Sequence, residues 1–257
     1  MKTDVIKAGI SVLDDVLPNG IPRRNMIFIA GEPGTAKSVI LQHLAYNFLS
    51  TLREPIIFLT LEQPAHAVVK DMVGLGWDIE KFVNERMIKF IDCFSFRIES
   101  KQTREYIEIL NNPKDMTSLT STVFQSIDKM DMNGRGAVFI DSLTELFVLE
   151  REKIFYHQIL EEVKTWRANG PKERNVLFFA THHYGIEALK ELEQSLNYVI
   201  DGIIDVRFEP KLLQEGILER ELRVRKMRGV FHDTRWIRFR VSENGITKVA
   251  SDQKDSA

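Results

Sequence analysis

The sequence predicts an α/β protein whose core is a mostly parallel sheet flanked by helices, with an antiparallel extension at the C-terminal end. Three observations predict this fold. Short apolar runs alternate with segments of helical length from Met26 to about Phe208. A Gly-rich turn joins the first of these runs to a helix. Beyond about Leu218, charged and apolar residues alternate, which is typical of half-exposed antiparallel strands.

The individual elements follow from hydrophobic periodicity and from turn residues. The predicted strands span residues 26–30, 56–61, 87–92, 137–141, 176–181, 202–208, 218–226, 236–241 and 246–249. The predicted helices lie within residues 9–17, from the Gly-rich turn to about 52, and over 65–75, 119–132, 146–166 and 188–199. Residues 95–117 are polar and weakly periodic, so we expect a loop with some helix there.

Length and composition set the expected organisation of the chain. A chain of 257 residues with 44% hydrophobic and 28% charged residues can bury a sizeable core. We expect one domain over residues 1–250 and a polar tail over 251–257, since no internal repeat or low-complexity tract divides the chain.

Charge and apolar patterning also restrict location and partners. No run approaches 18 apolar residues, the first residues lack the apolar core of a secretory signal, and Cys93 is the only cysteine. We therefore expect a cytoplasmic protein with no membrane contact. The formal net charge of −2 argues against a chain-wide surface for nucleic acid.

The Gly-rich turn Gly31–Ser38 matches the phosphate-binding pattern G-x-x-x-x-G-K-[ST] at seven of eight positions. Its backbone N–H groups and the start of the following helix present positive charge to a polyphosphate. Lys37 is expected to reach the outer phosphates, and the Ser38 hydroxyl to coordinate Mg²⁺. The expected nucleotide-binding residues are Gly31, Glu32, Pro33, Gly34, Thr35, Ala36, Lys37, Ser38 and Val39.

One position departs from this pattern, because Ala36 stands where the second glycine is expected. A residue that opens a helix has right-handed dihedral angles, which alanine tolerates. The expectation is therefore a small energetic cost and a working site.

Polar residues close three other predicted strands, at the sheet edge where parallel sheets bind ligands. Asp141 is expected to hold Mg²⁺, although it also fits a simple cap of the next turn. Glu62 is a candidate for activating water, or alternatively a solvated residue before the next helix. Thr181 and His182 can contact the γ-phosphate. A zinc site at His182 and His183 is disfavoured, since strand neighbours point to opposite faces and no third ligand lies at suitable spacing.

These motifs in this order resemble the KaiC-like branch of RecA-superfamily ATPases. The segment from Gly9 to Pro22 is similar to the lead-in TGIxxLDxxLxGGIP of that family. The resemblance continues through GEPGTAKS, the strand end at Glu62, the stretch Ile140–Thr144 and the pair Thr181–His182, and it ends at Lys226-Met227-Arg228-Gly229, with His232 and Gly245-Ile246 behind. It covers nearly the whole chain as one such domain.

The resemblance implies a RecA-type P-loop NTPase fold and a homo-oligomeric ring, usually a hexamer, with ATP and Mg²⁺ between subunits. Glu62 matches the first of two family glutamates and would activate water, whereas Gln63 replaces the second, which puts fast hydrolysis in doubt. Lys226 and Arg228 match a K-x-R element that reaches the neighbouring subunit's γ-phosphate. His232 would contact the ribose.

The alternation of β residues supports one part of this picture, because it places Leu222, Val224, Lys226 and Arg228 on one strand face. A solvated basic strand is the other interpretation of the same residues.

Other functions remain open at this point. An ATP-gated scaffold with little hydrolysis, acting on an unidentified protein partner, fits Ala36 and Gln63. A motor on single-stranded DNA is disfavoured, because residues 183–196 hold three glutamates and one lysine. No serine or threonine is marked as a site of autophosphorylation.

Overall fold

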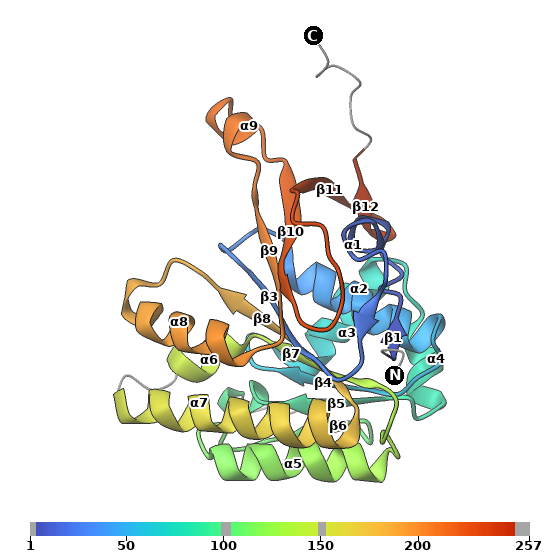
Figure 1. Cartoon of the computed structure of the whole chain (residues 1–257). Coiled ribbons are helices and arrows are strands. Elements are labelled where there is room, and N and C mark those ends of the chain that lie inside the picture. The colour runs from blue at the N-terminus through green and yellow to red at the C-terminus, as the bar shows by residue number, and fades with distance from the viewer. Residues whose placement is uncertain (1–3, 99–103, 149–152, 250–257) are drawn as a thin grey trace.

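The computed structural model describes residues 4–98, 104–148 and 153–249. Within these ranges a ten-stranded sheet forms the centre of the molecule (Figure 1). Its strands, in spatial order, are β12 (Gly245–Lys248), β11 (Ile237–Ser242), β10 (Arg220–Met227), β9 (Gly202–Phe208), β3 (Met26–Gly31), β8 (Leu177–His183), β7 (Ala137–Asp141), β4 (Ile56–Thr60), β5 (Ile88–Asp92) and β6 (Ile107–Ile109).

The sheet is parallel from β9 through β6 and antiparallel from β9 to β12. A separate antiparallel pair is formed by β1 (Val5–Ile6) and β2 (Ile21–Pro22). The parallel core with its antiparallel C-terminal extension confirms the predicted fold class. The carboxyl ends of the parallel strands share one edge, which brings the polar residues that follow them together.

Helices cover both faces of the sheet (Figure 1). One face is covered by α1 (Ser11–Val16), α2 (Lys37–Ser50), α3 (Ala65–Gly74) and α4 (Ile79–Asn84). The other is covered by α5 (Met116–Lys129), α6 (Leu143–Val148), α7 (Lys153–Arg167) and α8 (Lys190–Val199). Successive residues of a strand pack into the hydrophobic cores on the two opposite faces of the sheet. Phe179 stacks on Phe139 beneath Phe48 of α2, whereas Phe178 packs on the other face.

The structure corrects the predicted boundaries at several places. The segment 95–117 contains a short 3₁₀ turn (Ser95–Arg97) and the edge strand β6, which pairs with β5 through Phe90 and Ile107. In the region of the helix predicted over 146–166, α6 begins earlier, at Leu143, and α7 ends at Arg167, while residues 149–152 lie outside the described ranges. A π-helical turn follows α7 over Ala168–Arg174. The predicted tail over 251–257 also lies outside the described residues.

A β-bulge interrupts β10 and changes which way its cations face. Val224 pairs with Ile204, but the next paired residue, Lys226, stands opposite Ile203, which leaves Arg225 as the extra residue. Lys226 therefore lies on the opposite sheet face from Val224, because adjacent residues of β9 point to opposite faces. The prediction that Leu222, Val224 and Lys226 share one face was wrong, since simple alternation does not anticipate a bulge.

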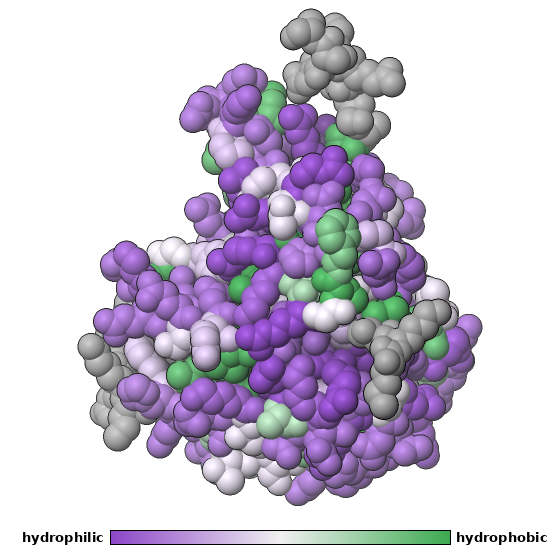
Figure 2. Space-filling model, in the orientation of Figure 1, coloured by the Kyte–Doolittle hydropathy of each residue, from purple (hydrophilic) through white to green (hydrophobic). Residues whose placement is uncertain are grey.

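The hairpin of β9 and β10 extends from the body of the molecule and carries helix α9 (Pro210–Gln214) at its tip (Figure 1). The face of the molecule in Figure 2 is mostly hydrophilic, with small and separate apolar areas. Among the described residues, no helix combines the length and apolarity that crossing a membrane requires.

Candidate nucleotide-binding site

The phosphate-binding loop lies between β3 and α2, in the predicted strand–turn–helix order. Gly31 is required by close packing, because a Cβ atom there would lie 2.0 Å from the carbonyl oxygen of Val206. Gly34 has a φ of 81°, which favours glycine. The Thr35 hydroxyl donates to the Glu32 carbonyl at 2.7 Å and closes the turn. The loop thus has a defined shape held by its own backbone.

Ala36 has left-handed dihedral angles, with φ 73° and ψ 26°. The expectation of a right-handed conformation was therefore wrong. The residue is the N-cap of α2, outside the first helical turn, so helical dihedral angles do not apply to it. For an L-residue with a Cβ atom, this conformation costs about 1–2 kcal/mol. The missing second glycine is a source of backbone strain beside Lys37.

Replacing Ala36 with glycine is expected to raise the free energy of unfolding by about 1 kcal/mol, because glycine adopts the left-handed region without a steric penalty. Urea denaturation without nucleotide measures this change. As a control, Ala67→Gly within helix α3 should lower stability by about 0.5–1 kcal/mol, since glycine weakens a helix interior. Equal destabilisation by both changes would contradict strain at Ala36.

Lys37 is buried at the first position of α2, and its ammonium donates to the Glu32 carbonyl at 2.8 Å. Burial lowers its pKa to about 8, and the negative charges of Glu62 and Asp141 oppose that shift. The cation is thus held inside the curve of the phosphate-binding loop, close to two carboxylates.

Asp141 is the last residue of β7, and its carboxylate contacts residues of both α2 and the neighbouring strand β8. Its Oδ1 accepts hydrogen bonds from the hydroxyls of Ser38 at 3.2 Å and Thr181 at 2.5 Å. Burial raises the pKa of Asp141 to about 6, the hydrogen bond from Thr181 lowers it in part, and the charge of Glu62 raises it. The structure therefore brings Ser38, Asp141 and Thr181 together. Hydroxyl and carboxylate oxygens are the ligands that Mg²⁺ prefers, so Ser38 and Asp141 fit that ion.

The buried carboxyl of Asp141 predicts a pH-dependent cost in stability. Its folded pKa lies above the ordinary 3.8, so the folded state binds more protons than the unfolded chain between about pH 4 and pH 6. Stability contributed by this group is lost as the pH rises through that window. The stability of Asp141→Asn relative to wild type should therefore rise by about 2 kcal/mol between pH 4 and pH 7.

Chemical denaturation across this pH range without Mg²⁺ provides the measurement. Asp128→Asn is the matched control, because Asp128 is an exposed partner of Arg174 and should show no comparable rise. A relative stability of Asp141→Asn that stays constant with pH would contradict the prediction.

Glu62 follows β4 and faces His183, whose Nε2 lies 2.8 Å from its Oε1. The hydrogen bond from His183 lowers the pKa of Glu62, against the effect of burial. Gln63 turns away and donates to the Asp71 carboxylate of α3 at 2.9 Å. The two neighbours thus have different surroundings, and only Glu62 faces the strand ends.

His183 and Thr144 also lie at this site, although the sequence predicted no nucleotide role for either and indicated His183 only as a disfavoured zinc ligand. The strand β8 extends two residues beyond its predicted end, so Thr181 and His183 share one face while His182 points to the other. The Thr144 hydroxyl accepts from the His183 N–H at 2.8 Å and lies 3.1 Å from His182 Nδ1. The signal for His183 was its position two residues after Thr181.

His182 is buried, and burial lowers its pKa to about 4. The ring is therefore neutral at pH 7, and its contact with Glu193 of α8 at 3.8 Å is not an ion pair at that pH. His182 thus faces α8, on the side of the sheet away from Thr181.

Lys226 and Arg228 are not part of this cluster. The Lys226 ammonium donates to the Asn197 carbonyl at 2.8 Å, and Arg228 contacts the Asp201 carboxylate at 3.4 Å. Met227 pairs with Gly202 beside Ile27, four residues before Gly31. At about 3.3 Å per residue, this separates the cations from their own loop by roughly 13 Å along the sheet.

His232 also lies apart from the loop, in the connection between β10 and β11. Its Nδ1 is 3.5 Å from the Val230 carbonyl, and the next residue, Asp233, donates from its N–H to Val16 near the end of α1. These contacts place His232 beside α1, in the segment that leads to β11.

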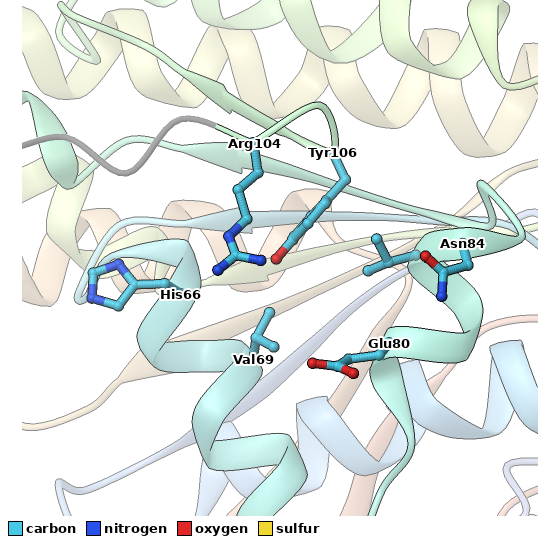
Figure 3. A pocket seen from close by; sticks show the side chains of 7 residues that line it. His66, Val69, Glu80, Asn84, Arg104 and Tyr106 are labelled. Carbon is cyan, nitrogen blue, oxygen red and sulfur yellow. The ribbon is translucent and has the colours of Figure 1, made fainter.

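A pocket of about 460 Å³ lies elsewhere, against α3, α4 and the segment that leads into β6 (Figure 3). None of the predicted site residues lines it. Arg104 and Tyr106 lie close together on one side, and Glu80 points inward from α4 (Figure 3). Its lining residues are His66, Val69, Glu80, Val83, Asn84, Arg104 and Tyr106.

The sheet order, the phosphate-binding loop and the acid at the end of β7 define a P-loop protein of the RecA type, with the features of a nucleotide site. The family model for the KaiC ATPase matches residues 6–253. The chain therefore belongs to the KaiC ATPase family, in which the P-loop binds ATP.

Relatives and a solved structure agree with this assignment. A UPF0273 protein of Methanocaldococcus jannaschii is 29% identical, and the match covers 94% of each chain. A UPF0273 protein of Thermotoga maritima is 27% identical over 96% of each chain. The crystal structure of a KaiC-like protein from Pyrococcus horikoshii matches with a TM-score of 0.75 at 21% identity, covering 97% of this chain and all of that one. This structural similarity supports the RecA-type fold.

Proposed function

We propose that the protein binds Mg-ATP and hydrolyses it slowly in a homo-oligomeric ring, which is hexameric in the usual form of such assemblies. The observation that carries the proposal is the cluster at the carboxyl ends of the strands. Lys37 and Ser38 are the first residues of α2 and lie beside Asp141. The Asp141 carboxylate accepts hydrogen bonds from hydroxyl groups of α2 and β8. Glu62 faces the same edge of the sheet.

In this proposal the residues of one chain have separate roles. The backbone N–H groups of the loop and Lys37 bind the phosphates. Ser38 and Asp141 would hold Mg²⁺, which when bound supplies charge neutralisation at the phosphate oxygens. Glu62 orients the attacking water and accepts its proton on the carboxylate, in the pattern of general base catalysis. Thr181 donates its hydroxyl to Asp141 and fixes that side chain.

The second part of the proposal concerns Lys226 and Arg228. Their distance along the sheet from their own loop favours action on the nucleotide of a neighbouring subunit, where Arg228 would neutralise charge during phosphoryl transfer. The side chain of Arg228 is 47% exposed, so it is accessible to such a neighbour. His232 belongs to the same end of the chain and would contact the neighbour's ribose.

ATP binding and turnover test the proposal together with assembly. Phosphate release, nucleotide binding and light-scattering molar mass should be measured with and without Mg-ATP for the wild type and Lys37→Ala. We expect Lys37→Ala to lose binding by about 10²-fold or more, since a buried charge-assisted contact to phosphate is removed. Unchanged binding in Lys37→Ala would show that the loop does not hold ATP.

The pairing of basic residues favours this function over one on nucleic acid. On the C-terminal strands Arg223 contacts Asp205 at 3.1 Å, Arg207 contacts Glu221 at 2.6 Å and Arg240 contacts Glu219 at 3.1 Å. These arginines are neutralised locally, so they are poor contacts for a phosphate backbone. A regulatory role in the cytoplasm, through a protein partner that responds to the bound nucleotide, completes the proposal.

A further inference from the structure

His183 contacts Glu62, the carboxylate that the proposed hydrolysis requires in a defined orientation. A catalytic carboxylate must be held in one orientation, because small displacements of a reacting group cost large factors in rate. Glu62 sits just after β4, and its side chain is one third exposed. His183 holds it from β8, two strands away in the sheet.

The contact is specific in its atoms. His183 Nε2 lies 2.8 Å from Glu62 Oε1. His183 Nδ1 is buried and has no hydrogen-bond partner within the described parts of the chain. A ring with its proton on Nε2 satisfies both facts, since it donates to the carboxylate and leaves no buried N–H on Nδ1 without an acceptor.

The backbone of His183 is fixed as well. Its N–H donates to the Thr144 hydroxyl at 2.8 Å. Its position on β8 is set by the pairing of that strand with β3, in which His183 stands opposite Gly31 of the phosphate-binding loop. The imidazole is therefore held by the same strand pair from which the loop begins. His183 thus fixes the position of Glu62 relative to the phosphate-binding loop.

We propose that His183 is a positioning residue that orients Glu62 through an Nε2–H hydrogen bond to Oε1, leaving Oε2 for the attacking water. This inference rests on the proposed ATP hydrolysis. His183 touches neither the phosphates nor the water, and it acts only through Glu62. No proton leaves the ring in this role.

The test is a set of variants compared for kcat and KM. His183→Ala should lower kcat about 10-fold, in keeping with a lost orientation effect, and should leave the KM for ATP within about 2-fold. His183→Gln should restore most of the rate, because its amide nitrogen can donate from a similar position. In a Glu62→Gln background, His183→Ala should have no further effect, which a purely structural role would not produce.

A second readout does not depend on nucleotide. Long-range proton–nitrogen NMR of the imidazole without ATP should show the proton of His183 on Nε2.

The kinetic comparison also has a matched control. His66→Ala and His66→Gln change an exposed histidine of α3 and should leave kcat unchanged.

The outcomes separate the two proposals. If the wild type shows no ATP turnover, the proposed function fails. If the wild type hydrolyses ATP and His183→Ala keeps full kcat, the positioning role is overturned while the function stands. Equal loss in His183→Ala and His183→Gln, or an additive loss on top of Glu62→Gln, also overturns it.

Discussion

Glu62→Gln is expected to lower ATP turnover by about 10²- to 10⁴-fold while Mg-ATP still binds within about 3-fold of the wild-type affinity. Glutamine keeps the size of the side chain and an oxygen that accepts the hydrogen bond from His183, but it cannot take a proton from water. Phosphate release and equilibrium binding of nucleotide, measured on the same preparations, separate chemistry from binding.

A second glutamate provides the control for the loss of one negative charge from the protein. Glu161→Gln removes a carboxylate from the exposed side of α7, where Glu161 pairs with Lys164, and turnover should not change. If Glu62→Gln hydrolysed ATP at the wild-type rate, another group would have to activate the water.

Arg228→Ala is expected to lower turnover by about 10³- to 10⁵-fold, the range for a cation that neutralises charge in phosphoryl transfer. Affinity for ATP should fall much less, because the effect belongs to the transition state. Arg86→Ala removes another arginine, whose side chain is 84% exposed near the opposite edge of the sheet, and should have no effect. Phosphate release measures all three proteins.

Mixed assemblies show whether the cation acts on a neighbouring subunit. When Arg228→Ala and Glu62→Gln chains are co-expressed with different tags and purified through both, some interfaces combine an intact Glu62 with an intact Arg228. Activity should then rise well above that of either variant. A mixture no more active than its components would mean that Arg228 does not act between subunits.

Much of the site could be predicted because parallel strands share a carboxyl edge. The loop, Glu62, Asp141 and Thr181 each follow an apolar run, and the sheet then brings them together. The contact between Thr181 and Asp141 could not be predicted, since it depends on the packing of two side chains across β7 and β8. The family resemblance added the idea of a shared site, which remains a proposal.

The errors have local physical causes. Ala36 was assigned to the helix by its place in the pattern, whereas the loop needs a left-handed residue at its last position before Lys37. The weak period of 95–117 concealed β6, because its three residues are too few to show alternation. The two faces of β10 were misassigned because a bulge leaves no mark in hydrophobic spacing.

The extra residue in β10 also makes one point of this strand tolerant of shortening. Loss of a residue from a regular strand inverts every side chain beyond the cut, exchanging buried for exposed positions. Loss of Arg225 would instead turn the irregular ladder into a regular one, so Lys226 and Met227 would keep the sides they have now. Natural length variation within this strand should therefore concentrate at Arg225.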